Sequence, residues 1–345
     1  MHLLKILKIR FEIFKPKKSD ILLYDTNMVS EFSNFVNKKF SILQVRPFKI
    51  NLFILINVFM RSGFNNLKIN YLVGYINSVN PKIIVTFNDI DLNFYKLNKY
   101  LSPKIKMIAI QHTLKIKKNW KFFTKSKINF KNNYNVLFSK NYSKIYSKYI
   151  RSKQFIGGSF RNNFFKKNRV KKKNILFISS IKENNTLEKN MFSREKKTVQ
   201  NLSDYSKKKC IGFTILTKNV DRKNYKKMLD LDLNCDFIDT NIIMNKYKFL
   251  DKFELSIFID STLGLETLSR GNKVLSIPHK RNYNIIKGFF VEKNLNFSNF
   301  EKKVDELFYM KKNLWNKKIK EESNFIIYDY KNKKLKKLFK RFLKN

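Results

Sequence analysis

The sequence predicts an α/β protein of two domains, each built on a parallel β-sheet. Short apolar runs that end in polar residues recur along the chain, and segments of helix length lie between them. A continuous apolar run is typical of a strand buried on both faces, and its alternation with helices is typical of a parallel sheet. The chain has only 8 Gly and 5 Pro in 345 residues, which argues against a many-turned β-sandwich.

The apolar runs form two series. The first consists of residues 21–24, 40–44, 83–87, 107–110 and 136–138, with helix-like segments at 49–62, 66–79 and 140–150. The second consists of residues 174–178, 213–216, 235–238, 255–259 and 274–277, with helix-like segments at 186–209, 222–231, 246–252 and 264–270.

Domain boundaries follow from these series. We expect an N-terminal domain at 1–160, a basic linker at 161–173, a C-terminal domain at 174–298 and a Lys-rich helical tail at 299–345. The linker follows the only Gly-Gly pair of the chain and contains a run of Lys and Arg, as exposed connections often do. The tail is expected to pack back on the domains.

The formal charge of +47 suggests either a nucleic acid or an anionic membrane as partner. Lys greatly outnumbers Arg, and the Lys residues are spread along the whole chain, which indicates a compositional bias more than a selected patch. We therefore expect a solvated basic surface, peripheral contact with an anionic membrane and no nucleic-acid partner. A basic, non-catalytic protein that binds nucleic acid or membrane remains the alternative.

Other features place the protein in a compartment. The basic, apolar segment 1–15 predicts an amphipathic helix or an edge strand, because charges interrupt its apolar run and no cleavage site follows. The longest apolar run, 52–60, is half of what a bilayer span needs. Two Cys and three His favour a reducing compartment and no metal site. We expect a cytoplasmic protein at the inner face of the plasma membrane.

Ligands of open α/β sheets bind beyond the carboxyl ends of the strands. The polar residues that follow the predicted strands are therefore the candidate site residues: Asp25, Asn88, Asp89, Gln111, His112, Ser179, Ser180, Thr217, Lys218, Asp260 and Ser261.

The segment 255–277 predicts a strand, a tight turn, a short helix and another strand. Ser261 and Thr262 suit the helix N-cap, and Gly264 lets a ligand approach the backbone. The free N–H groups from Ser261 through Leu263 to Gly264 suit a phosphate, and Glu266 can accept ribose hydroxyls. The alternative is an ordinary capped strand–helix unit, in which Glu266 serves only the helix dipole.

The residues Asp260 to Val274 resemble the donor-binding segment of GT-B glycosyltransferases. More narrowly, they resemble bacterial surface-carbohydrate biosynthesis proteins with a D-S-T-L-G-x-E-x-L-x-R-G motif. Segments 81–89, 107–114 and 156–163 are similar to other parts of that family in the expected order. His112-Thr113 stands where Asn-Gly is common, and Asn88 replaces an apolar residue.

This resemblance implies a GT-B-like fold of two Rossmann-like domains whose parallel sheets face across a cleft. It implies transfer of a sugar from a nucleotide-sugar donor to a surface polysaccharide, such as lipopolysaccharide, or to a lipid-linked glycan, without metal or cofactor. Glu266 would hold the ribose and the helix start the diphosphate. A sugar-nucleotide epimerase of the same fold is the alternative.

Chemical roles can be assigned to the remaining candidates. The hydroxyls of Ser179, Ser180 and Thr217 and the amine of Lys218 would contact the donor. The base for the acceptor hydroxyl would be Asp89 or His112, with Asp25 a weaker candidate and His279 a possible donor contact. Each has a structural alternative: helix capping for the serines, a surface Lys, a turn Asp or a hydrogen-bonded structural His.

Overall fold

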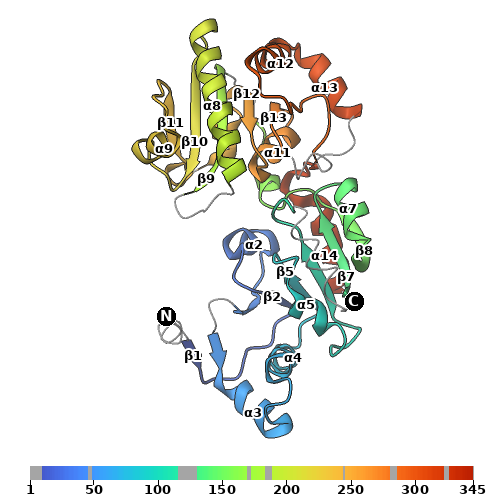
Figure 1. Cartoon of the computed structure of the whole chain (residues 1–345). Coiled ribbons are helices and arrows are strands. Elements are labelled where there is room, and N and C mark those ends of the chain that lie inside the picture. The colour runs from blue at the N-terminus through green and yellow to red at the C-terminus, as the bar shows by residue number, and fades with distance from the viewer. Residues whose placement is uncertain are drawn as a thin grey trace. The chain divides into compact units, whose positions relative to one another are not determined.

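The structure is a computed structural model that describes residues 10–45, 49–115, 130–168, 172–182, 189–243, 245–279, 286–321 and 326–344. The chain divides into two compact units (Figure 1). The first comprises Met1–His112, Asn119–Phe164 and Asp329–Asn345, and the second comprises Thr113–Lys118 and Phe165–Tyr328. Within the described ranges, no helix combines the length and the apolar character that crossing a membrane requires.

The first unit is built on a six-stranded sheet in which every pairing is parallel. Across the sheet the strands are β3 (Ser41–Leu43), β2 (Ile21–Tyr24), β5 (Ile83–Thr86), β6 (Lys106–Ile110), β7 (Phe130–Leu137) and β8 (Ile150–Ile156). A separate parallel pair consists of β1 (Arg10–Glu12) and β4 (Lys49–Asn51).

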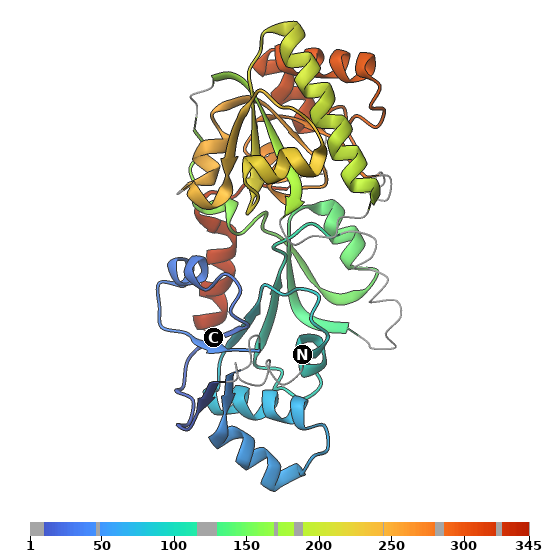
Figure 2. The same ribbon diagram turned by 60° about the vertical axis from the view of Figure 1, so that its left-hand side comes forward.

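Helices cover both faces of this sheet. Alternate strand residues such as Ile21, Leu23 and Ile83 share a buried apolar cluster with α2 (Val29–Val36) and α14 (Lys333–Lys344), and Figure 2 shows α14 in red beside these strands. The remaining helical elements of this unit are α3 (Leu52–Ser62), α4 (Leu67–Val79), α5 (Leu92–Leu97), α7 (Lys140–Tyr146), η1 (Asn162–Phe164) and η4 (Tyr330–Asn332).

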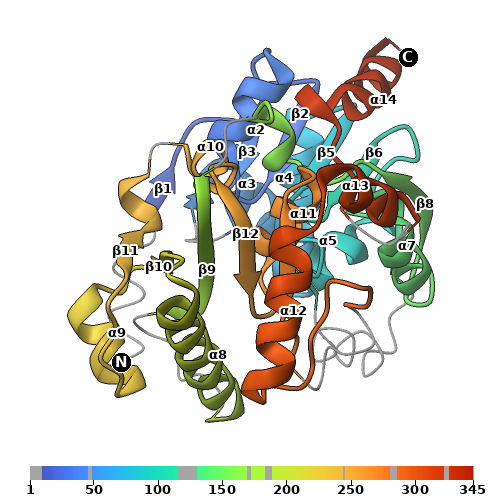
Figure 3. The same cartoon turned by 90° about the horizontal axis from the view of Figure 1, so that it is seen from above.

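The second unit is built on a five-stranded parallel sheet. Across the sheet the strands are β11 (Asp236–Asp239), β10 (Phe213–Lys218), β9 (Lys172–Lys182), β12 (Phe253–Phe258) and β13 (Lys273–Ser276). The helical elements are α8 (Lys189–Lys209), α9 (Arg222–Leu229), η2 (Thr240–Ile242), α10 (Lys246–Leu250), α11 (Thr262–Ser269), α12 (Phe297–Tyr309) and α13 (Lys312–Glu321). Helices α8 and α12 pack against each other (Figure 3).

All ten predicted strands are present, and the predicted α/β class is confirmed. Two strands were not predicted, β4 and β8, whereas β1 lies in the segment 1–15, for which the sequence predicts an amphipathic helix or an edge strand. Helix α7 ends at Tyr146, and β8 begins at Ile150, where the sequence predicts the end of a helix. Residues 1–9, part of the segment predicted as helix or edge strand, lie outside the described residues.

The segment 161–173 was expected to be an exposed linker, but residues near its start are buried in the first unit. Asn162 and Asn163 are fully buried in the first unit, where Asn163 donates to the carbonyl of Gly157 at 2.9 Å and to Asn332 at 2.8 Å. The Lys-rich tail is divided between the units, because α12 and α13 belong to the second and α14 to the first. Apolar side chains on one face of α14 fill a gap in the first core, which explains its burial there.

Candidate functional site

In the second unit, four of the candidate residues lie where the strand order reverses. From one edge of the sheet to the other, the strands are the third, second, first, fourth and fifth of the unit in chain order. The chain therefore adds strands on one side of β9 first and then, from β12 on, on its other side. Open α/β sheets bind ligands at such a switch point, beyond the carboxyl ends of the strands. Ser179 and Ser180 are near the end of β9, and Asp260 and Ser261 follow β12, so the sheet brings these four candidates to its switch point.

The turn from β12 into α11 is shaped by Asp260 and Ser261. Asp260 has a left-handed φ of 43°, and its carboxylate accepts the backbone N–H of His279 at 3.2 Å. Ser261 is the N-cap of α11, and its hydroxyl accepts the N–H of Gly264 at 3.4 Å. Thr262 Oγ1 accepts the N–H of Leu114 at 2.9 Å. The predicted cap is confirmed, and the turn holds the first N–H groups of α11 at the switch point.

Gly264 is required by packing in this turn. A Cβ at position 264 would overlap the buried ring of Phe258, the last residue of β12. The glycine therefore brings the start of α11 directly onto the strand that precedes it.

Gly264→Ala is expected to destabilise the second unit by about 1–3 kcal/mol, because the added methyl forces Phe258 out of its place. Urea unfolding of the variant measures this loss. Combining it with Phe258→Leu should cost less than the two single changes added together, because the smaller side chain gives the methyl room. Strictly additive losses would show that the two residues do not meet.

Glu266 lies in α11 and is 6% exposed. The hydroxyl of Tyr247, in α10, donates to Glu266 Oε2 at 3.0 Å. This contact fixes the carboxylate from the side of α10. A fixed carboxylate one turn into a helix at the switch point is suited to accepting ribose hydroxyls.

Ser179 and Ser180 are held by a buried carboxylate that the sequence did not single out. Glu195 of α8 accepts the hydroxyl of Ser179, the N–H of Ser180 at 3.0 Å and the hydroxyl of Tyr225 at 2.7 Å. Burial raises the pKa of Glu195, and burial together with the Glu195 charge raises that of Tyr225 well above its usual value. Ser180 Oγ donates to the carbonyl of Ile259 at 2.5 Å, which links the ends of β9 and β12.

The other candidates of the second unit are less central. Thr217 is buried, and its hydroxyl donates to the carbonyl of Val220 at 2.8 Å, so it shapes the turn after β10. Lys218, the last residue of β10, is exposed. His279 is buried beside Asp260, to which its backbone N–H donates.

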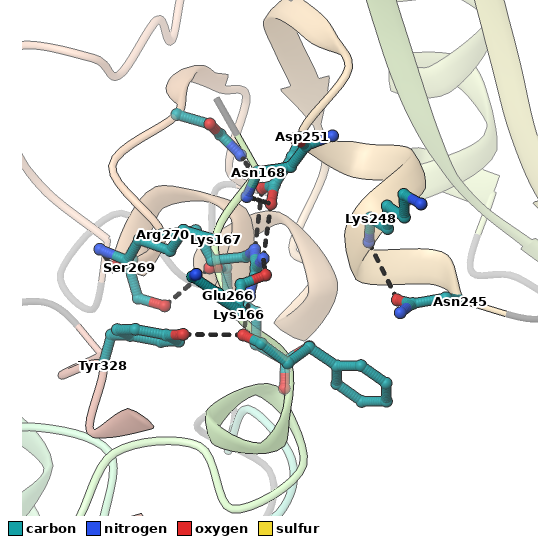
Figure 4. Close-up of polar contacts among 12 residues, drawn as sticks. Lys166, Lys167, Asn168, Asn245, Lys248, Asp251, Glu266, Ser269, Arg270 and Tyr328 are labelled. Carbon is teal, nitrogen blue, oxygen red and sulfur yellow. Dashed lines mark hydrogen bonds and ion pairs between the residues drawn. The ribbon is translucent and has the colours of Figure 1, made fainter. Parts of the chain in front are cut away.

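Arg270 follows α11 and makes a buried ion pair with Asp251 (Figure 4). Its Nε donates to Asp251 Oδ1 at 2.8 Å, and its Nη2 to Oδ2 at 2.5 Å. Nη1 and Nη2 also donate to the carbonyls of Phe165 and Lys166 at 2.9 and 2.7 Å. Two further donors, from Asn272 and Asn168, reach the same carboxylate at 2.7 Å each. This cluster fixes the end of α11 against the end of α10 and the chain segment 165–168.

In the first unit, Asp89 follows β5 and is fully buried. The hydroxyl of Tyr146, from α7, donates to Asp89 Oδ2, and the hydroxyl of Tyr95 donates to the Asp89 carbonyl at 2.9 Å. Burial and the nearby Asp89 carboxylate raise the pKa of Tyr146 well above its usual value. Tyr146 therefore stays protonated and remains a donor to Asp89.

His112 follows β6, the neighbour of β5, and lies beside Asp89. Its Nδ1 is 3.9 Å from Asp89 Oδ1, an ion-pair distance, and 28% of its side chain is exposed. The sheet thus brings the two predicted base candidates together. The separation is longer than a hydrogen bond, so the contact is electrostatic: the negative charge of Asp89 attracts positive charge that develops on the imidazole, and Nε2 is the nitrogen that can exchange a proton.

The remaining polar candidates of the first unit shape its turns. Asp25, with a φ of 87°, accepts the N–H of Thr26 at 2.6 Å. Asn88 donates from its amide to Asp91 at 3.2 Å, and Gln111 accepts the N–H of Phe138 at 3.1 Å. Tyr146 and Tyr95 were not predicted, because nothing in the sequence near either residue relates it to Asp89.

A family described as "putative O-antigen biosynthesis protein" matches residues 108–343, more than half of the chain. The chain belongs to this family. The expected resemblance to bacterial surface-carbohydrate biosynthesis proteins is therefore confirmed. No curated protein matches the chain in sequence.

Solved structures with the same fold cover nearly the whole chain. The UDP-GlcNAc 2-epimerase of Neisseria meningitidis, bound to UDP-GlcNAc, is 13% identical with a TM-score of 0.54, over 93% of this chain and 99% of that one. The UDP-GlcNAc 2-epimerase of Methanocaldococcus jannaschii is also 13% identical, with a TM-score of 0.56 and the same coverage. The wall teichoic acid polymerase TagF is 11% identical, with a TM-score of 0.53, over 95% and 90%. The predicted GT-B-like fold is confirmed.

Proposed function

We propose that the chain is a glycosyltransferase that moves a sugar from a nucleotide-sugar donor to a surface polysaccharide or lipid-linked glycan. One observation carries this proposal: the D-S-T-L-G-L-E segment 260–266 begins a helix at the switch point of a GT-B-like unit, in a chain of an O-antigen biosynthesis family. Such a helix start offers N–H donors to a diphosphate, and Glu266 offers a carboxylate to a ribose.

In the proposed reaction, the bond between the sugar and the nucleoside phosphate breaks as the acceptor hydroxyl attacks the sugar. His112 accepts the hydroxyl proton at Nε2, while Asp89 stabilises the resulting imidazolium from the Nδ1 side. The N–H groups of Ser261, Thr262 and Leu263 stabilise the departing phosphate, while that of Gly264 is held by the Ser261 cap. We further propose that this takes place without a metal, in the cytoplasm, with Ser179, Ser180, Thr217 and Lys218 close to the donor.

A sugar-nucleotide epimerase is the second candidate. Both epimerases named above align with this chain over 99% of their own lengths. At an identity of 13%, this likeness shows only that the fold is shared. An epimerase would change the donor without any acceptor.

Product analysis separates the two. The protein is incubated with UDP-GlcNAc and related nucleotide sugars, with and without a membrane extract that contains lipid-linked glycans. A transferase releases the nucleoside phosphate and lengthens the glycan only when acceptor is present. Formation of a new nucleotide sugar from donor alone would contradict transfer and support epimerisation.

A further inference from the structure

Helix α3 of the first unit has an apolar outer face. Phe53, Ile56 and Met60 lie at helical positions i, i+3 and i+7, so they form one stripe, and Met60 is 79% exposed. Phe59 is also exposed and packs edge-on against Phe64, in the turn that follows, at 4.9 Å between ring centroids. In the described part of the chain, eight of the twelve exposed large apolar side chains lie between residues 11 and 64. This is a concentrated patch and not scattered exposure.

The other three of these eight side chains are next to α3 on the segment that contains β1. Phe11, Ile13 and Phe14 are all more than half exposed. β1 pairs with β4, which leads directly into α3, and the amide of Asn51 donates to the carbonyl of Phe14 at 2.7 Å. Figures 1 and 2 both show β1 beside α3. The two sets of exposed side chains thus lie on neighbouring segments, and we call them together the α3 surface.

The α3 surface is firmly held from behind. Ile54 and Val58, on the inner side of α3, are buried against α4, where a Cβ at Gly74 would come within 2.8 Å of Val58 Cγ2. Asn51 caps the helix by accepting the N–H of Ile54 at 3.1 Å. The inner side chains of α3 therefore attach the helix to the rest of the unit. The outer apolar stripe takes no part in this packing.

Cations frame this apolar surface. Residues 10–18 and 49–68 contain seven basic side chains and one acidic one, Glu12, which forms an ion pair with Lys49. Arg10, Lys15, Arg61 and Lys68 are exposed. An apolar helix face framed by Lys and Arg fits the boundary between the headgroups and acyl chains of an anionic bilayer. A second copy of the chain is a poorer fit, because a symmetric contact would bring like charges together.

We propose that the α3 surface docks the protein on an anionic phospholipid bilayer, with α3 in the plane of the interface. The eleven residues of α3 are too few to span a bilayer, so the helix contributes its outer face alone. This inference goes beyond the proposed function, because it does not depend on which reaction the protein catalyses.

Vesicle co-sedimentation tests the proposal. The full chain is mixed with vesicles of phosphatidylcholine alone or with added phosphatidylglycerol. Because the whole chain is basic, the decisive comparison is between variants. Ile56→Gln/Met60→Gln should weaken binding to the anionic vesicles by at least about tenfold, since it removes two inserted apolar side chains. Ile242→Gln/Leu314→Gln, which removes two exposed apolar side chains of the second unit, should bind as the wild type does.

A second variant tests the charge contribution. Arg61→Gln/Lys68→Gln should weaken binding to anionic vesicles by about tenfold and leave the weak binding to phosphatidylcholine unchanged. Equal binding of the wild type and Ile56→Gln/Met60→Gln would overturn the proposal. The proposal would also be overturned if the wild type formed a dimer in light scattering, this variant did not, and the wild type did not bind vesicles. Turnover of a water-soluble acceptor or of donor alone should be the same in the wild type and all three variants, which keeps this test separate from that of the proposed function.

Discussion

Replacing Asp89 by Asn is expected to lower the kcat of the proposed sugar transfer by about 10²- to 10⁴-fold while the fold is kept. Asn fills the same space and can still accept from the Tyr146 hydroxyl. It lacks the negative charge that stabilises protonated His112, and its amide can present a donor to His112 Nδ1. His112→Ala removes the proposed base and should lower kcat to a similar extent. Steady-state kinetics with saturating donor and acceptor measures both.

Tyr146 is a positioning residue in this account, because it touches Asp89 and acts through it. Tyr146→Phe should lower kcat by about tenfold and leave the KM for the donor unchanged, since it removes one charge-assisted hydrogen bond. Tyr100→Phe, the same change at an exposed tyrosine of the first unit, is the matched control. Wild-type kcat in both Asp89→Asn and His112→Ala would show that the base lies elsewhere.

Arg270→Ala is expected to lower the free energy of unfolding of the second unit by about 3–5 kcal/mol. The change leaves Asp251 with its charge buried and without the guanidinium that lies against it. It also removes the donors to the carbonyls of Phe165 and Lys166. For a unit of this size, the melting temperature should fall by roughly 6–20 °C.

Two further variants distinguish loss of the ion pair from loss of packing. Arg270→Lys should recover only part of the stability, because an ammonium cannot donate twice to Asp251 in the same plane. Lys223→Ala, at an exposed cation of α9, should change stability by less than about 0.5 kcal/mol. An Arg270→Ala protein that melts with the wild type would contradict the assigned role.

The parallel sheets could be predicted because buried strands leave a strong sequence pattern. Ile83–Thr86 is fully buried and reads as a continuous apolar run, and it is a central strand of the first sheet. β8 was missed because it is an edge strand that mixes apolar residues with Arg151, Lys153 and Gln154. The start of β7 was missed for a related reason, since Lys131 and the Asn residues after it break the apolar pattern.

Part of the candidate site could also be predicted. Asp89 and His112 were both identified because a polar residue at a strand end marks a sheet edge, and adjacent strands bring such residues together. Tyr146 could not be found in this way, because it comes from α7, 57 residues along the chain from Asp89. The ion pair of Asp251 with Arg270 could not be predicted either, because only the packing of α10, β12 and α11 brings the two residues together.

Glu195 illustrates a different limit. It lies in a helix whose sequence is dominated by Lys, and there it looks like one more surface charge. Only the fold shows that it is buried and that it accepts donors from Ser179, Ser180 and Tyr225. The two serines were predicted for the donor, and the structure shows what holds them in place.

Nucleotide binding to the second unit is the most direct test of the central claim that segment 260–266 holds a nucleotide sugar. Isothermal titration and thermal shift are run with UDP, GDP, CMP and CDP on the wild type and on Glu266→Ala, with circular dichroism to confirm that the variant is folded. At least one nucleotide should raise the wild-type melting temperature by several degrees at about 100 times its Kd. Glu266→Ala should weaken that nucleotide by about 10- to 100-fold, because two hydroxyls lose a charged acceptor. A folded Glu266→Ala protein that binds with the wild-type Kd would contradict the claim.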